Sequence, residues 1–276
     1  MQRLRSAIAV ALLAALTASP VAGQDVPSVG PSVRVGDGVY ELVVHQATGD
    51  VFVASIGTWG EDQGRIHVLD GATLEEKRTI RTPGSTPFGM GISQSSGTIY
   101  ATDTAAGTVV VFDIASMSVT RVIENPADES GHLREVVVDE ERGRVYVSSY
   151  ADEGLIWVID DTTHSLVDTF VGVGDGTSGM ALDPENHRLF AANMAGGDIT
   201  EIDLDTGAFV RRFASGGERP SNLELDRARG RLWSANQRSN NATVLDVETG
   251  EVLRSISTGD QALGIRHNPV NDLMYV

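Results

Sequence analysis

Seven side chains occupy two adjacent positions of a repeated sequence pattern, the first position of each repeat window and the position before it, and their types could bind a small charged ligand. They are Tyr40, Glu41, Phe88, Arg134, Glu135, Ser178 and Asn222. Carboxylates can hold a cation or the amine of a ligand, and an arginine can bind an anionic group through charge-assisted hydrogen bonds. The same residues could instead form an arginine–carboxylate network that pins neighbouring strands, because buried polar groups must find partners. Either interpretation requires a fold that brings them together.

Signatures of catalysis are weak. Glu41, Glu135 and His132 could together hold a divalent cation, as a metal-assisted hydrolase or lyase would require. However, the six histidines include no pair four residues apart and no HExxH motif, and the nucleophile motif G-x-S-x-G is absent. The chain has no cysteine, which excludes thiolate nucleophiles and cysteine-based metal sites. We therefore expect a non-catalytic protein without a cofactor, with a divalent cation as the alternative.

The elements that must position these residues form an internal repeat of about 43 residues. Six windows align without a gap on one aromatic residue, at residues 41–52, 89–100, 135–146, 179–190, 222–233 and 264–275. Each window is an apolar strand, a polar turn and a second strand, which predicts a β-hairpin. After each of the first five windows, an aspartate closes a third apolar run, at Asp70, Asp113, Asp160, Asp203 and Asp246. A fourth strand follows, and four short antiparallel strands are one blade of an all-β propeller.

The first position of each window should lie at one end of the central channel of the propeller. Its occupants are Glu41, Gly89, Glu135, Gly179, Asn222 and Gly264. Glycine lets backbone segments approach closely, and the other three residues bring polar groups to the same place. We call this place the channel mouth, and we predict that the seven residues named first lie there.

Several tracts resemble a known family of repeats. RLFAAN (residues 188–193) and RLWSAN (231–236), each followed by a turn, resemble the YVTN repeats of β-propellers. More closely, GVYELV (38–43), PFGM (87–90), LREVVVD (133–139), IWVID (156–160) and SGMALD (178–183) are similar to the YncE-like exported propellers. The resemblance extends over residues 24–276 and implies a seven-bladed ring outside the cytoplasm. It implies no activity, since members of the family are mostly binding or uncharacterised proteins.

The sequence accounts for about five and a half of these seven blades. Residues 32–35 align with a fourth strand and are expected to be the outer strand of a last blade, whose other strands would come from the C-terminal side. The chain stops at Val276, inside the second strand of a sixth blade. We therefore expect residues 24–276 to be a propeller domain that is incomplete at its C-terminus.

Residues 1–23 have the pattern of a secretory signal peptide. Arg3 and Arg5 precede a ten-residue apolar run, and small residues then lead to a cleavage site before Gln24. The run is too short to span a bilayer, and no later segment has eighteen apolar residues, so we expect no membrane insertion. The mature protein is expected to be periplasmic or secreted.

The charge balance indicates which partners the protein can bind. The chain has 38 acidic and 21 basic residues, and loss of Arg3 and Arg5 leaves 19 basic residues. A negative field repels nucleic acid and favours a protein, peptide or small ligand that is cationic, so nucleic acid is not expected as a partner. The leading hypothesis is a monomeric, non-catalytic binding scaffold that uses the channel mouth.

Overall fold

The predicted hairpins and third and fourth strands are present as four-stranded antiparallel sheets. The computed structural model describes residues 30–276 except 59–60, 62, 83 and 130. Residues 33–276 form one unit, to which the following description applies. The predicted signal peptide lies outside the described residues.

Each sheet follows the chain order, and neighbouring strands are consecutive in sequence. Blade one contains β1 (Val39–His45), β2 (Asp50–Ser55), β3 (Arg65–Asp70) and β4 (Glu76–Arg81). Blade two contains β5 (Pro87–Ser93), β6 (Thr98–Asp103), β7 (Thr108–Asp113) and β8 (Ser118–Glu124). Blade three contains β9 (Leu133–Asp139), β10 (Arg144–Ser149), β11 (Leu155–Asp160) and β12 (Ser165–Val171).

The same order continues in the rest of the unit. Blade four contains β13 (Thr177–Asp183), β14 (Arg188–Asn193), β15 (Asp198–Asp203) and β16 (Phe209–Ala214). Blade five contains β17 (Pro220–Asp226), the 3-10 helix η1 (Arg227–Arg229), β18 (Arg231–Asn236), β19 (Asn241–Asp246) and β20 (Val252–Ser257). A sixth, two-stranded sheet contains β21 (Arg266–Asn268) and β22 (Leu273–Tyr275).

The repeated aspartates close the third strand of every blade because their carboxylates organise the turn that follows. Asp203 Oδ1 accepts hydrogen bonds from the backbone N–H groups of Asp205 and Thr206, at 3.0 and 2.8 Å. Asp246 makes the same pair of contacts one blade later. A short side chain that satisfies the turn's own backbone donors favours a tight turn over a longer strand.

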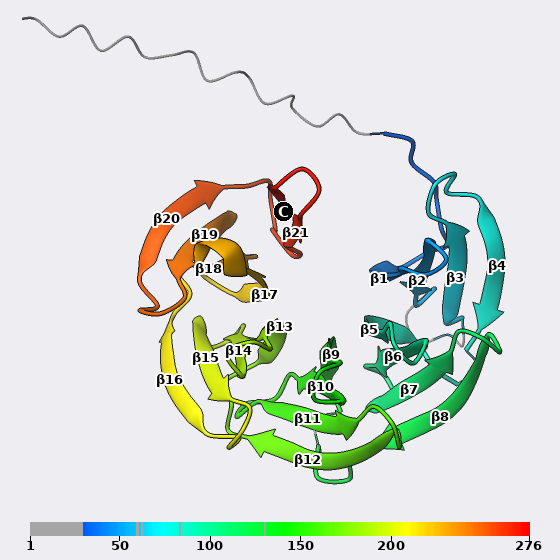
Figure 1. Cartoon of the computed structure of the whole chain (residues 1–276), viewed down its shortest axis with the longest axis horizontal. Helices are drawn as coiled ribbons and strands as arrows, with labels where there is room; N and C mark the ends of the chain where they lie inside the picture. The colour runs from blue at the N-terminus through cyan, green and yellow to red at the C-terminus, as the bar shows by residue number, and fades with distance from the viewer. Residues whose placement is uncertain (1–29, 59–60, 62, 83, 130) are drawn as a thin grey trace, which may run out of the picture. The chain divides into compact units, whose positions relative to one another are not determined.

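The blades pack face to face around a central space lined by the inner strands β1, β5, β9, β13 and β17 (Figure 1). The apolar core is divided into clusters between neighbouring blades. Phe52 and Phe112 pack between blades one and two, and the fully buried Trp157 packs with Tyr100 between blades two and three. Within the ring, a cavity of about 460 Å³ is lined by the inner strands. Burial between blades therefore fixes the direction in which each inner strand faces this space.

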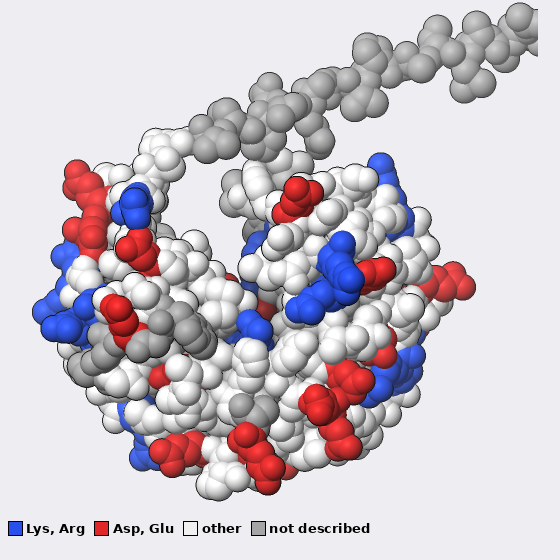
Figure 2. Space-filling view, turned by 180° about the vertical axis from the view of Figure 1, so that it is seen from behind, with Lys and Arg blue, Asp and Glu red and all other residues white. Residues whose placement is uncertain are grey.

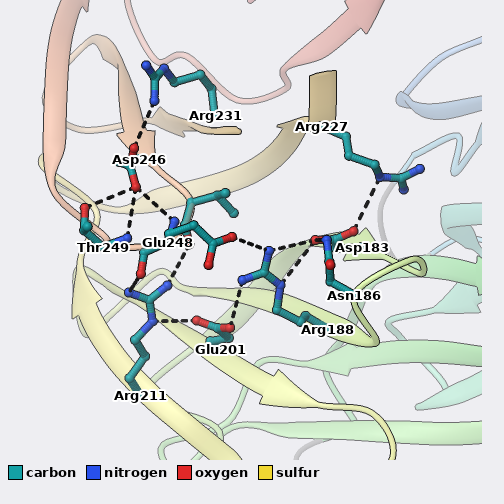
Figure 3. A network of polar contacts seen from close by, with 11 residues as sticks. Asp183, Asn186, Arg188, Glu201, Arg211, Arg227, Arg231, Asp246, Glu248 and Thr249 are labelled. Carbon is teal, nitrogen blue, oxygen red and sulfur yellow. Dashed lines mark hydrogen bonds and ion pairs between the residues drawn. The ribbon is translucent and has the colours of Figure 1, made fainter. Parts of the chain in front are cut away.

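Polar contacts join the blades near the turns that follow the third strands (Figure 3). Arg188 of blade four lies 2.9 Å from Glu248 of blade five and 2.9 Å from the buried Asp183. Arg211 of blade four donates to the Glu248 carbonyl at 2.8 Å. Arg227 of blade five lies 3.4 Å from Asp183. These contacts join blades four and five from the inner strands outward.

The predicted all-β propeller of four-stranded blades is confirmed, with five complete sheets and a two-stranded sixth. The outer strand expected at residues 32–35 is not formed in this structure, because a strand requires a hydrogen-bonded neighbour and none of the described strands lies beside it. In the part of the chain that the structure describes, no helix has the length and apolar character needed to cross a bilayer.

Candidate functional site at the channel mouth

The predicted site residues lie where the inner strands depart from regular pairing. In blade one the register with β2 shifts between Val39 and Leu42, and in blade two the register with β6 shifts between Pro87 and Met90. The intervening residues are the pairs Tyr40–Glu41 and Phe88–Gly89. Blades three, four and five have the corresponding irregularity at Arg134–Glu135, Ser178–Gly179 and Ser221. Such bulges redirect side chains away from the regular alternation of a strand, here at one end of every inner strand.

Hydroxyl groups join the inner strands of blades two to five in series near these bulges. Thr102 Oγ1 donates to the carbonyl of Arg134 at 2.9 Å. Ser148 Oγ accepts from the Glu135 N–H at 3.0 Å and donates to the carbonyl of Ser178 at 2.5 Å. The predicted ligand-binding residue Ser178 in turn donates to the carbonyl of Ser221 at 3.2 Å. Its hydroxyl therefore contributes to the spacing of the inner strands.

Glycine at the first window position permits a close approach of neighbouring inner strands. A Cβ atom at Gly89 would lie 1.9 Å from the carbonyl oxygen of Arg134, and one at Gly179 would lie 2.4 Å from the Cα atom of Asn222. No side chain fits at these distances. The glycines thus bring the backbones of adjacent blades together, as the sequence predicted for a crowded channel.

Six of the seven predicted residues line one cavity of about 120 Å³. They are Tyr40, Glu41, Arg134, Glu135, Ser178 and Asn222. The remaining residue, Phe88, stacks on Tyr40. Ser221 and residues 263–266 complete the lining. The repeat therefore brings together residues from four blades and from the segment that leads into β21.

Glu135 is the centre of the polar contacts in this cavity. Its side chain is 8 % exposed and lies 3.0 Å from Arg266, which is also 3.1 Å from Glu224. Asn222 Nδ2 donates to the second carboxylate oxygen of Glu135 at 2.6 Å. Burial raises the pKa of Glu135, although the charge and hydrogen bond of Arg266 oppose the increase.

Glu41 faces this group without an ion pair of its own among the described residues. Burial, followed by repulsion from Glu135, raises the pKa of Glu41 to about 8, and the more distant Arg266 only partly opposes this. At neutral pH the mouth therefore contains a protonated carboxyl group, which can donate one hydrogen bond. When a cation binds to it, this group can release its proton to the solvent.

An arginine without a carboxylate partner among the described residues forms the other side of the cavity. The Arg134 guanidinium lies 5.3 Å from the ring centre of Phe88 and 5.5 Å from that of Tyr150, distances typical of cation–π contacts. It also makes a hydrogen bond with Tyr40. Its Nε atom is buried and has no hydrogen-bond partner in the described part of the chain, and the same is true of Asn222 Oδ1. The cavity wall thus contains one unsatisfied donor and one unsatisfied acceptor.

His132 does not join the carboxylates in a metal site. Its ring packs 5.3 Å from that of Tyr150, and burial together with the charge of Arg134 lowers its pKa. Among the described residues, no group of three or more histidine, aspartate and glutamate side chains is placed to hold a metal ion. The proposed trio of Glu41, Glu135 and His132 is therefore not assembled.

Blade one contains a hydrogen-bonded series in the order of a nucleophile, a base and an acid. Ser55 Oγ lies 3.0 Å from His67 Nε2, and His67 Nδ1 lies 3.0 Å from Glu76 Oε1. Ser55 and His67 are buried, and a Cβ atom at Gly36 would lie 2.9 Å from His67 Nε2. Buried polar pairs occupy the same strand positions in blades four and five, namely Asn193–Thr200 and Asn236–Thr243. This recurrence assigns the series a structural role in pairing the second and third strands.

Sequence reasoning missed Arg266 and Glu224, which complete the charge network of the mouth. Both occupy the third position of a window, where the first four windows have Val43, Gly91, Val137 and Ala181. A change from small or apolar to charged residues at one repeat position was the available signal. Tyr150 was missed because it lies outside the aligned windows.

The chain is 29 % identical over 206 residues to the uncharacterised protein YncE of Salmonella typhi, and this match covers 72 % of the chain. With YncE of Escherichia coli K12 it shares 29 % identity over 176 residues, or 61 % of the chain. The chain is similar to YncE. The resemblance predicted from the sequence is thus confirmed. The chain spans about half the length of these curated relatives, 57 % and 49 % respectively. No protein-family model matches it.

The YncE-like chain also has the fold of a solved structure with little sequence similarity. A chain in the crystal structure of a nidogen/laminin complex superimposes with a TM-score of 0.64 at 15 % identity. The match covers 82 % of this chain and 83 % of the other. At this identity the likeness concerns the fold alone.

Proposed function

We propose that this protein is a non-catalytic binding scaffold outside the cytoplasm, and that it binds a cationic protein segment, peptide or small ligand at the channel mouth. The observation that carries the proposal is the cavity itself, whose wall includes buried polar atoms without partners and a carboxyl group without an ion pair among the described residues. Arg134, which has no carboxylate partner among the described residues, lines this cavity together with Glu41. Such groups can bind a ligand through charge-assisted hydrogen bonds.

The charge of the molecule supports the same choice of partner. The chain has 38 acidic and 21 basic residues, and acidic side chains are distributed over the face seen in Figure 2, with basic ones between them. Such a field attracts cations over distances longer than the cavity. Export is proposed on the sequence of residues 1–23 alone.

The alternative function is that of a metal-assisted hydrolase or lyase. It requires several ligands around one ion, and the described carboxylates and histidines are not placed to provide them. The ion pair of Glu135 with Arg266 also occupies a carboxylate that a metal would need.

The test is ligand binding by NMR with ethylammonium, spermidine and trilysine as probes. We expect chemical-shift changes at residues of the mouth, and their loss in Glu41→Gln and in Asn222→Ala. The matched control is Glu75→Gln, which removes one exposed carboxylate from the turn between β3 and β4 and should bind as the unsubstituted protein does. No shifts with any probe, or equal shifts in all three variants, would contradict the proposal.

A further inference from the structure

The channel mouth contains a guanidinium group and a carboxyl group that line one cavity and have no ion-pair partner among the described residues. The first is Arg134, which packs between aromatic rings and has no carboxylate within ion-pair distance among the described residues. Its guanidinium group lines the cavity and has five N–H donors in a fixed fork. Its natural complement is a carboxylate or another small anion.

The second is the carboxyl group of Glu41. Arg266 is already engaged by Glu135 and Glu224, so it does not neutralise Glu41 directly. Tyr40 precedes Glu41 in the chain and makes a hydrogen bond with Arg134, and all three residues line the same cavity. The complement of the Glu41 carboxylate is an ammonium group.

The size of the cavity limits what can satisfy both groups. Its volume of about 120 Å³ corresponds to roughly four water molecules at about 30 Å³ each. An ion with an ammonium and a carboxylate separated by one or two carbon atoms has about this size. A longer ligand would have to extend out of the mouth.

We propose that the mouth binds a compact zwitterion, a free amino acid or a similar molecule, with its carboxylate on Arg134 and its ammonium between Glu41 and Asn222. This inference rests on the proposed binding function and specifies its ligand. A zwitterion supplies both missing partners at once, whereas a simple amine leaves Arg134 unpaired and a simple anion leaves Glu41 unpaired.

Binding of this kind must release a proton, because Glu41 is protonated at neutral pH and must ionise to hold an ammonium group. The charged and titratable groups that face Glu41 are Tyr40, Arg134, Glu135, Glu224, Arg227 and Arg266. Affinity should therefore rise with pH between about 6 and 8, by at most about tenfold per pH unit.

The experiment is isothermal titration calorimetry of the whole chain with glycine, ethylamine and acetate at pH 6 and pH 7. Each titration is repeated in two buffers of different ionisation enthalpy, so that proton release is measured directly. We expect glycine to bind at least tenfold more tightly than either single-charge probe, with about one proton released. Arg134→Gln should reduce glycine binding to the level of ethylamine, and Glu41→Gln should abolish the proton release. Arg254→Gln, which changes an exposed arginine outside the cavity, should leave both unchanged.

Three results would overturn the inference, and they separate it from the function on which it rests. Equal binding of glycine and ethylamine refutes the zwitterion but leaves a cation site at the mouth. Equal binding of glycine and acetate refutes it and leaves an anion site. No binding of any probe, combined with no NMR shifts from the longer polyamines and peptides, refutes the proposed function as well. Where Arg134→Gln does not fold, the three ligands on the unsubstituted chain decide the question.

Discussion

Among single residues, the chemistry of the mouth depends most on Glu41, whose carboxyl group has a raised pKa. Glu41 and Glu135 belong to blades far apart in sequence, and the ring places both beside one cavity. Arg266 and Asn222 stabilise the ionised form of Glu135 by direct contacts. Glu41 lacks such contacts among the described residues, so burial and the neighbouring negative charge favour its protonated form.

This difference predicts how stability depends on pH. The folded-state pKa of about 8 for Glu41 lies above its ordinary value of 4.5, so the folded protein holds an additional proton between these values. The free energy of unfolding should therefore fall as pH rises from 4.5 to 8 and then level off, with a slope of at most about 1.4 kcal/mol per pH unit from this group. Glu41→Gln should flatten the slope in urea unfolding at pH 5, 6, 7 and 8, while Glu75→Gln keeps it. An unchanged slope in Glu41→Gln would show that Glu41 ionises normally.

Each of the five inner strands has a bulge, and in blades two and four it also has a close backbone contact to the next blade. The bulge directs the side chains at the mouth, and the glycines of blades two and four allow the next strand to approach. Position one of the repeat therefore alternates between polar side chains and glycines, two of which lie against the next strand.

Substitution at the glycine positions tests this division. Gly89→Ala should lower the free energy of unfolding by about 1–3 kcal/mol, because its Cβ atom would meet the Arg134 carbonyl oxygen at 1.9 Å. Gly264→Ala is the matched control, since Gly264 occupies the same repeat position and no described atom lies within 4 Å of the place that its Cβ atom would take. We expect a change below about 0.5 kcal/mol there in chemical denaturation. Similar losses in both variants would mean that the repeat position itself, rather than the contact, requires glycine.

Across the whole molecule, the blades are joined by apolar clusters and by arginine–carboxylate contacts at the periphery. The turn after the third strand receives a side chain from the preceding blade several times around the unit. Arg142 contacts Asp205 at 2.8 Å, Arg188 contacts Glu248 at 2.9 Å and Tyr100 donates to Asp161 at 2.7 Å. The recurring contact predicts that neighbouring blades unfold together.

The contact between blades four and five gives the clearest test of this coupling (Figure 3). Arg188→Met removes the ion pairs to Asp183, Glu201 and Glu248. The buried Asp183 then keeps the ion pair with Arg227 and the hydrogen bond from Asn186. We expect a loss of about 2–4 kcal/mol in the free energy of unfolding, in a transition that remains single. Arg254→Met, at an exposed arginine of β20, should change stability by less than about 0.5 kcal/mol. Two separate transitions in Arg188→Met would show that the blades are coupled mainly through this network.

Sequence patterns were sufficient to predict the blade and much of the mouth. Period-two strands, the aspartate after each third strand and the alternation of glycine with Glu41, Glu135 and Asn222 are local or repeated features, so an ungapped alignment finds them. Glu41, Glu135 and Asn222 come from different blades and line one cavity, because every blade repeats the same geometry.

The pairing of charges, in contrast, became apparent only in the folded ring. Arg266 forms ion pairs with Glu135 and Glu224. Arg134 instead packs against two aromatic rings and has no carboxylate partner among the described residues. The alternative hypothesis from the sequence grouped His132 with the carboxylates, and in the fold its ring lies beside that of Tyr150. The pairing of charges depends on distances of a few ångströms between side chains that are as much as 131 positions apart in the sequence. A repeat pattern predicts which positions lie near the same end of the channel, but it does not give the distances between their charged atoms.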